Sequence, residues 1–444
     1  MNFNIFRKSK RSFPIDNNII ERLILSGTFV NSNPIVLYNY SDVDFLEKGY
    51  ASNLDVFKII NKINSKCNIA TPYVYIDNLG VKSYKKNIKD SIDYGNHRLR
   101  VNKYLDFAPE NLDLAELIKN PNDSQTWNEF ITLIRIFYLV QGEAFIYRNA
   151  GDNNCAISLH CVPAHMVKTI VKGGVLHGWA VITESGTKRE FTGEDVNDIL
   201  HLKMPNPIYN NYKNFRGMSP LLAGLKYLQQ NDKGILSWVK SLENEGAKGI
   251  VSPNHPNPQL WLTPDQVIET QKAVEEKIHG SDNKNKIAVS GMPLQYTQIG
   301  LSPDALNIVE AIKFSGNQLS DLWGVPAAVF ESNPTYQNQK TASERLVKEV
   351  VLPQLKTEED KFNSWLVKPF SKRDNKNYVF DYDLSDYEEL RINLEDVENL
   401  LKTHTINEVR IMQGSDEIEN EYADEIFIPT GMVPLSDYNI DIGL

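Results

Sequence analysis

Residues 219–246 read SPLLAGLKYLQQNDKGILSWVKSLENEG, and the architecture is most easily recognised from this stretch. Ser219 is a residue type that caps helix N-termini, and Pro220 suits the first helical position because its missing N–H needs no partner there. Large apolar residues then recur at spacings of three, four and seven, at Leu221, Leu225, Leu228, Ile235, Val239 and Leu242. The pattern ends at Gly246 and predicts an amphipathic helix about 40 Å long, at roughly 1.5 Å per residue.

The same start signal recurs at Ser302–Pro303, and a second helical pattern runs from there to Gly324. Its apolar positions are Leu306, Val309, Ile312, Leu319 and Trp323. Between the two helices, strand-like patterns occupy Lys248–Ser252, Lys286–Ser290 and Leu294–Ile299, and Thr263–Pro264 starts a helix that reaches Ile278. We therefore expect a small module of strands and one helix, carried by two long helices.

The chain before Ser219 mixes helical and strand periods. Helices are predicted over Asn53–Lys66 and Trp127–Val140, where apolar residues share one face, and Gly142 ends the second helix. Short strands separated by Gly, Pro and Asn are predicted at Thr71–Ile76, Glu143–Arg148, Ile157–Val162, Met166–Val171, Gly178–Ile182 and Asp198–Leu202. This part of the chain is therefore expected to be an α+β body.

The chain after Gly324 begins with an irregular stretch, because prolines and asparagines recur in Val325–Asn338. A helix is predicted at Gln339–Val367, and Pro353 inside it should produce a kink, since proline removes a backbone donor and clashes with the preceding turn. A strand is predicted at Asn377–Tyr382. Two short helices should follow, because Ser385 with Glu388 and Thr405 with Glu408 have the capping-box spacing.

Composition places the chain among folded globular proteins. Its 444 residues suffice for roughly three compact units, with 41% hydrophobic and 23% charged residues. Lys and Arg number 47 against 57 Asp and Glu, and the formal net charge of −10 disfavours a general affinity for nucleic acid. The basic cluster Arg7, Lys8, Lys10 and Arg11 is interpreted as a solvated tail rather than a nucleic-acid or membrane arm.

The cysteine pattern and the hydropathy indicate a soluble protein in a reducing compartment. Cys67, Cys155 and Cys161 are too few and too irregularly spaced for a disulfide framework, so we expect free thiols. The most apolar stretch, Ile131–Val140, is far short of the roughly 20 residues that cross a bilayer. We expect neither a targeting segment nor a membrane partner.

Motifs of several enzyme classes are absent from the sequence. The chain has no G-x-x-x-x-G-K-[ST], G-x-G-x-x-G, H-E-x-x-H or G-x-S-x-G, which argues against an NTPase, a dinucleotide enzyme, a zincin and a serine hydrolase. One metal-like cluster consists of Cys155, His160, Cys161 and His165. Because adjacent strand residues point to opposite faces, a structural role is favoured for this cluster. We expect no catalytic residue, no cofactor and no metal.

Two further patterns have unremarkable interpretations. The D-x-D pairs Asp42/Asp44 and Asp381/Asp383 are interpreted as solvated turn residues, because no phosphate-binding loop accompanies them. The helix pair at Ser385–Gln413 has the layout of a DNA-binding helix-turn-helix. However, Arg410 is the only cation of its second helix, which runs into the acidic stretch Asp416–Glu425, so this function is disfavoured.

The order of these segments resembles that of phage portal proteins of the HK97-like type. The matching stretches are Gln141–Arg148 (QGEAFIYR), Leu159–Val167 with Pro163, Asp198–Lys203, Arg216–Pro220 (RGMSP), Gly300–Pro303 (GLSP), Trp323–Pro326 (WGVP), Thr335–Asn338, Pro353 and Asn407–Arg410 (NEVR). The resemblance covers about residues 50–435 and rests on the order and spacing of the stretches.

The resemblance implies an α+β portal fold with a wing, a stem of long helices, a small α/β clip, a tunnel loop and a helical crown. Similar proteins assemble as rings, commonly of twelve copies. The implied boundaries are an unassigned N-terminal segment 1–50, wing 51–218, stem helix 219–246, clip 247–300, stem helix 301–323, tunnel loop 324–338, kinked helix and wing return 339–384, crown 385–430 and C-terminal tail 431–444.

The resemblance also implies a structural channel rather than an enzyme. Similar proteins occupy one capsid vertex of the virion, bind the terminase large subunit and later the head-tail adaptor, and let double-stranded DNA pass without sequence specificity. Their other partners are the major capsid protein and the scaffold, in the host cytoplasm during assembly. Twelve copies at −10 each would carry about −120 formal charges, and a lumen of that sign would repel phosphates. The alternatives are an α+β transferase-type enzyme that uses an Asp pair, and an oligomeric scaffold that does not conduct DNA.

Candidate site residues follow from the implied parts. Uncharged tunnel-loop contacts to passing DNA are expected from Val325, Pro326, Ala327, Ala328, Val329 and Phe330. The expected partner contact of the clip consists of Glu269, Lys272, Glu276 and Lys277. On the stem, Leu225 and Val309 are expected to pack on neighbouring copies, and Lys313 and Asp321 to face the channel or solvent.

Overall fold

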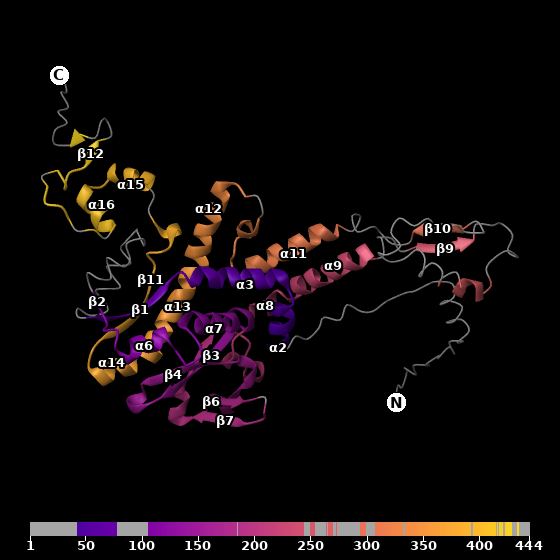
Figure 1. Ribbon diagram of the computed structural model, residues 1–444, viewed down its shortest axis with the longest axis horizontal. Coiled ribbons are helices and arrows are strands. Elements are labelled where there is room, and N and C mark those ends of the chain that lie inside the picture. The colour runs from indigo at the N-terminus through magenta and orange to yellow at the C-terminus, as the bar shows by residue number, and fades with distance from the viewer. Residues whose placement is uncertain are drawn as a thin grey trace, which may run out of the picture. The chain divides into compact units, whose positions relative to one another are not determined.

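The computed structural model falls into two compact units (Figure 1). It describes residues 42–77, 105–183, 185–243, 249–253, 263, 265–269, 272, 294–298, 307–331, 334–391, 394–413, 415, 417–420, 422–428 and 433–434. The larger unit contains the described residues of 40–228 and 316–444, and the smaller unit contains those of 229–315. Among these residues, no helix combines the length and the apolar character that a membrane span requires.

The larger unit begins with helices, of which the sequence predicts only those that start at Leu54 and Trp127. They are α2 (Asp42–Asp44), the π-helical η1 (Phe45–Ala51), α3 (Leu54–Cys67), α6 (Asp113–Lys119) and α7 (Trp127–Gln141). Helix α3 starts because the Asn53 side chain accepts the Val56 N–H at 3.0 Å, and α7 starts at a capping box of Thr126 and Glu129. Helix α7 packs on α3 and on strand β3 (Glu143–Ala150) within the apolar core (Figure 1).

Short antiparallel sheets complete this body, in the strand orders β11-β1-β2, β4-β3-β8 and β5-β6-β7. The further strands are β1 (Thr71–Asp77), β2 (Leu105–Phe107), β4 (Ala156–Val162), β5 (Val167–Lys172), β6 (Val175–Ile182), β7 (Lys188–Thr192), β8 (Ile199–Lys203) and β11 (Tyr378–Asp383). Short 3-10 turns join strands at η3 (Asp152–Asn154), η4 (Ala164–Met166) and η5 (Gly193–Asp198), and a further turn, η6 (Asn210–Phe215), follows β8. The sequence does not predict β7, because three exposed residues precede its buried Phe191 and the apolar alternation is missing.

One long helix continues from Tyr336 to Asp374 through two π-helical stretches. Its segments are α12 (Tyr336–Arg345), η10 (Leu346–Val351), α13 (Leu352–Phe362), η11 (Asn363–Val367) and α14 (Lys368–Asp374). Pro353 and Pro369 each come directly after the first residue that follows a π-helical stretch. A wider turn accommodates the missing N–H and the bulk of the ring, so the helix passes both prolines. The disturbance predicted at Pro353 therefore takes the form of η10.

The two long helices predicted at 219–246 and 301–323 are present, with changes at their ends. The first consists of α8 (Pro220–Ala223) and α9 (Leu225–Glu243), interrupted at Gly224 because glycine is a weak helix former. Ser219 does not cap it, because its hydroxyl donates to Val140 O at 2.6 Å instead. The second helix, α11, is described from Ile308 to Leu322, and its predicted start at Ser302–Pro303 lies outside the described residues.

In the smaller unit, α9 and α11 approach each other closely. A Cβ at Gly234 would lie 2.8 Å from Ile312 Cγ1, so a larger residue there would collide with the Ile312 side chain. Strands β9 (Gly249–Pro253) and β10 (Leu294–Gln298) pair antiparallel, as first and third strands of the predicted module. Asp265–Glu269 are helical as predicted, and the strand predicted at Lys286–Ser290 lies outside the described residues.

The C-terminal part of the larger unit contains short elements. They are η12 (Glu388–Leu390), α15 (Leu394–Leu401), α16 (Ile406–Met412), β12 (Phe427–Ile428) and β13 (Val433–Pro434). The capping box predicted for Thr405 and Glu408 is confirmed at the start of α16. The one predicted at Ser385 is wrong, because its hydroxyl donates to Asp383 Oδ1 at 2.6 Å and only a 3-10 turn follows.

Candidate functional site

The recognisable sequence stretches meet at the C-terminal turn of α7. The last carbonyls of a helix have no partner inside it. Here Leu139 O accepts the Trp323 indole N–H at 3.0 Å, and Val140 O accepts the Ser219 hydroxyl at 2.6 Å. Because Trp323 follows α11 and Ser219 precedes α8, both long helices are tied to one turn. We call this contact region the α7 joint; it comprises Leu139–Glu143, Arg216–Ser219 and Ser320–Val325.

Two glycines bring backbones into direct contact at the α7 joint. Gly142 ends α7 with a φ of 78°, and a Cβ there would lie 2.0 Å from Met218 O. Gly217 faces it, and a Cβ there would lie 2.2 Å from Gly142 O. No side chain fits at either position. The glycines of QGEAFIYR and RGMSP are therefore required by the contact between these two stretches.

Glu143 links the same two stretches through its side chain, which is buried. Its Oε1 accepts the Arg216 Nε–H at 2.7 Å, and its Oε2 accepts the backbone N–H of Gly217 at 2.7 Å. The same Oε2 lies 2.9 Å from His201 Nε2. One carboxylate thus connects β3, β8 and the segment that leads into α8.

The Arg216 guanidinium extends this network to the neighbouring sheet. It donates to Val167 O at 2.6 Å and to Ala164 O at 2.9 Å, and it lies 5.6 Å above the centre of the Phe145 ring. A planar group with several donors is needed to reach these acceptors at once, so lysine would not replace this arginine.

Burial and hydrogen bonding act on the pKa values of the joint. Burial alone would raise the pKa of Glu143, but hydrogen bonds from His201, Arg216 and Gly217 outweigh it, and the pKa is lowered. The pKa of His201 is lowered because its burial outweighs the attraction of Glu143. Near neutral pH the joint therefore holds an ionised carboxylate, an uncharged imidazole and a guanidinium.

Acid should destabilise the α7 joint through His201. The pKa of this histidine is lower in the folded protein than in the unfolded chain, where it is about 6.5. Its contribution to stability is therefore fully present above about pH 6.5 and is lost as the pH falls through the pKa of the folded protein. Protonation of Glu143 also lowers the free energy of unfolding, but only below about pH 4.3, the pKa of a glutamate in the unfolded chain. In urea unfolding, the free energy of unfolding should therefore drop more between pH 7 and pH 5 in the wild type than in His201→Gln. Exposed His160, replaced by Gln, is the control and should behave as wild type; equal drops in all three proteins would contradict the role of His201.

The base of the expected tunnel loop belongs to the joint. Ser320 Oγ donates to Val325 O at 2.7 Å, and the Val325 N–H donates to Ser320 O at 3.1 Å. Val325 is 0% exposed, so its expected contact with passing DNA is wrong: the side chain packs in the core. Ala327–Phe330 form the 3-10 turn η9 rather than irregular chain. Exposure rises along the turn, and Phe330 is 37% exposed.

The other expected site residues belong to α9, to α11 and to the insert between them. Val309, Lys313 and Asp321 are exposed on α11. Leu225 is half-buried and packs against the core of the larger unit, and its expected contact with a neighbouring copy stays a prediction. In the insert, Glu269 and Lys272 are exposed, whereas Glu276 and Lys277 lie outside the described residues.

The metal-like patterns do not form metal sites in the part of the chain that the structure describes, where no three His, Cys, Asp or Glu side chains are placed to hold an ion. The three cysteines are free, and His160 is exposed beside Ser158. Asp381 and Asp383 are each 6% exposed within β11. Their interpretation as solvated turn residues is wrong, because β11 is buried along its whole length.

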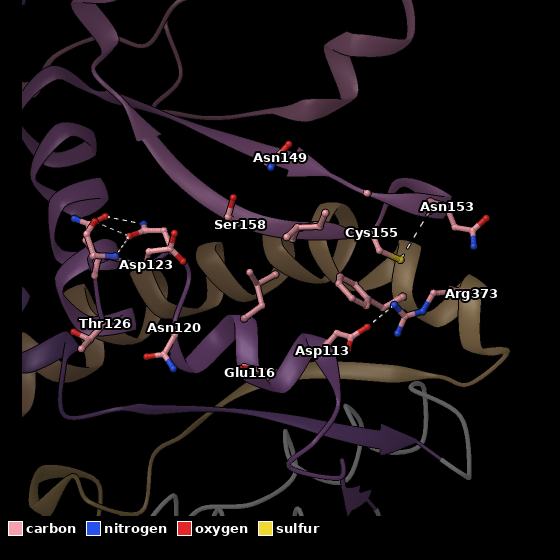
Figure 2. Close-up of a pocket in the computed structure, with 18 of the residues that line it drawn as sticks. Asp113, Glu116, Asn120, Asp123, Thr126, Asn149, Asn153, Cys155, Ser158 and Arg373 are labelled. Atoms are coloured by element: carbon pink, nitrogen blue, oxygen red, sulfur yellow. Dashed lines mark hydrogen bonds and ion pairs between the residues drawn. The ribbon is translucent and has the colours of Figure 1, made fainter.

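A polar hollow of about 1250 Å³ lies beside α6, β4 and α14 (Figure 2). Carboxylates and amides line it, among them Glu116 and Asn149. Arg373 reaches its edge and donates to Asp113 at 2.7 Å and Asp374 at 2.7 Å. Neither D-x-D pair lines this hollow, so it does not provide the site that a transferase would need.

Sequence reasoning identifies the stretches around Glu143, Arg216 and Trp323 without identifying what these side chains do. One sequence feature could have pointed to these residues, since each of the three is directly next to a glycine. Such a pair indicates a close backbone approach supported by a side-chain bond, but it does not indicate the partner.

Comparison with known proteins identifies the family. The family model described as phage portal protein matches residues 103–414, which is more than half of the chain. Similar solved structures include the neck of an empty GTA particle, computed with C6 symmetry, at 17% identity and a TM-score of 0.58. The neck of a native GTA particle, computed with C12 symmetry, has 17% identity and a TM-score of 0.57. Both cover 89% of this chain and 99% of their own. Among curated proteins there is no match.

The chain belongs to the phage portal protein family, and its α+β fold is that of portal proteins. Members of this family are structural channel proteins of the virion and not enzymes. The chain is therefore a capsid portal subunit for DNA packaging, and nothing supports the transferase alternative.

Proposed function

We propose that twelve copies of this chain form a ring around a channel for double-stranded DNA at one capsid vertex. The ring would dock the terminase large subunit during packaging in the host cytoplasm and the head-tail adaptor afterwards, within a shell of major capsid protein built on a scaffold. The observation that carries the proposal is the family match over residues 103–414. The likeness to a neck computed with C12 symmetry agrees with it.

The proposed parts keep the boundaries implied by the sequence. The wing is 51–218, the stem helices are 219–246 and 301–323, and the clip is 247–300. The tunnel loop is 324–338, followed by the helix and wing return 339–384 and the crown 385–430. The α7 joint supports this division, because it fastens the bases of both proposed stem helices and of the tunnel loop to the proposed wing.

Helix α9 supports contact between copies through its distribution of side chains. Ile235, Leu236 and Val239 are 38%, 58% and 42% exposed, and Val309 on α11 is 40% exposed. A different face of α9 carries the exposed polar residues Lys226, Gln230, Lys233, Ser237 and Lys240. In a ring, the apolar side chains would pack on the neighbouring copy, since each subunit of a cyclic assembly meets two neighbours.

Charge at the apolar positions should break the ring. We expect Leu236→Glu and Val309→Glu to weaken assembly roughly tenfold or more, because each would bury an unpaired carboxylate between copies. Ser237→Glu, on the polar face of α9, is the matched control and should assemble as wild type. Native mass spectrometry over a concentration series measures the ring fraction; undiminished rings in both apolar-site variants would contradict the assigned interface.

The channel and partner surfaces form the last part of the proposal. Lys313 and Asp321 are exposed and would face the channel or solvent. Phe330 and the half-buried Pro326–Val329 would offer uncharged contacts to DNA, which slide over phosphates without ion pairs to be broken. The exposed Glu269 and Lys272, together with Glu276 and Lys277 of the same predicted helix, would contact the motor or adaptor.

A further inference from the structure

We propose that Trp323 is a positioning residue for the tunnel loop: its indole N–H holds the base of the loop against the end of α7, and so sets where Ala327–Phe330 lie in the channel. This inference rests on the proposed function, because it assumes that residues 324–338 act on DNA. Trp323 itself would touch no DNA, since it is 8% exposed.

The indole N–H of Trp323 binds a backbone carbonyl that lies at the end of α7. Its Nε1 donates to Leu139 O at 3.0 Å, and this bond is buried. Leu139 lies in the last turn of α7, where carbonyls lack a helical partner. The bond therefore satisfies a buried donor and a buried acceptor together, and it spans 184 residues of sequence.

Backbone hydrogen bonds fix the chain between Trp323 and η9, so this segment moves together with the indole. The Gly324 N–H donates to Asp321 O at 2.9 Å, and Ser320 and Val325 exchange two hydrogen bonds. Val325 is then fully buried, and η9 starts two residues later. A displacement of Trp323 relative to α7 must therefore move the start of the tunnel loop with it.

Trp127 provides an internal comparison. It is also buried, at 4% exposed, and it lies in the same apolar core as Trp323. Its Nε1, however, has no hydrogen-bond partner. Trp127→Phe and Trp323→Phe both replace a buried indole by a smaller ring. Only Trp323→Phe also breaks a hydrogen bond.

Two measurements on the full-length chain test the inference. Hydrogen exchange of purified rings should be faster in peptides that cover 320–330 in Trp323→Phe, where the N–H groups of Gly324 and Val325 are hydrogen-bonded, and unchanged there in Trp127→Phe. Losing roughly one hydrogen bond should favour local opening, and so speed this exchange, about fivefold. Particles assembled with Trp323→Phe should show a lower ratio of DNA-filled to empty particles than wild type. Particles with Trp127→Phe should stay near the wild-type ratio.

The outcomes separate this inference from the proposed function. Normal exchange and normal filling in Trp323→Phe, or equal losses in both variants, would overturn the positioning role while leaving the ring intact. Absence of rings in the wild-type protein would instead overturn the proposed function.

Discussion

Replacing Gly142 by alanine should destabilise the protein by more than about 4 kcal/mol, the range reserved for severe core disruption. Two costs add at this position. A non-glycine residue at a φ of 78° costs about 1 to 2 kcal/mol. In addition, the new Cβ would lie 2.0 Å from Met218 O and 2.3 Å from Met218 C, and backbone atoms cannot move aside as a flexible side chain does. The segment before α8 would have to separate from α7.

Gly174 supplies a closely matched control for the Gly142 experiment. Its φ is 79°, almost that of Gly142, but a Cβ there would meet nothing within 4 Å. Gly174→Ala should therefore cost only the conformational term, about 1 to 2 kcal/mol. Urea unfolding, with soluble yield as a second readout, compares the two variants. Similar losses would show that the backbone contact at the α7 joint contributes little.

Truncating Glu358 should cost about 3 to 5 kcal/mol, because it leaves a buried guanidinium without its counter-ion. Arg135 and Glu358 are each 1% exposed and form a bidentate pair at 2.7 and 2.8 Å between α7 and α13. Tyr382 OH also donates to Glu358 at 2.8 Å, and Asn68 accepts from Arg135 at 2.6 Å. Glu358→Ala would leave all of these donors short of a partner.

Two companion variants test the physical reason for the Glu358 effect. Glu349→Ala removes an exposed i,i+4 pair with Arg345 at 3.3 Å and should cost less than about 1 kcal/mol. The double replacement Arg135→Met with Glu358→Leu should recover most of the loss, since an apolar pair leaves no buried charge. Thermal unfolding of the three variants is the measurement. A double variant as unstable as Glu358→Ala would show that the loss comes from packing rather than from an unpaired charge.

Features specified within a few residues of sequence are predictable here. Thr405 and Glu408 stand three residues apart, and their capping box forms as expected. The helix at Trp127 likewise ends at its local signal, Gly142. The same kind of signal fails where a distant partner competes for it. Ser219 has the right type and position for a cap, but Val140 O, 79 residues away in sequence, takes its hydroxyl.

The sequence stretches that form the α7 joint can be recognised from the sequence, but the contacts between them cannot. Glu143 meets His201 and Arg216 across 58 and 73 residues, and no local period encodes such a meeting. Val325 is an apolar residue in a segment without a helical or strand pattern, which suggests an accessible side chain. Its hydrogen bonds with Ser320 instead orient the side chain toward the core. The order of the stretches carries the family resemblance because each stretch supplies one side of a long-range contact.

The most direct test of the portal assignment is the size and shape of the purified full-length chain. Native mass spectrometry together with electron microscopy should show a ring with an axial hole, and twelve chains of 50.6 kDa each give a mass of about 607 kDa. A compact monomer of 50.6 kDa at every concentration, or an oligomer without an axial hole, would contradict it.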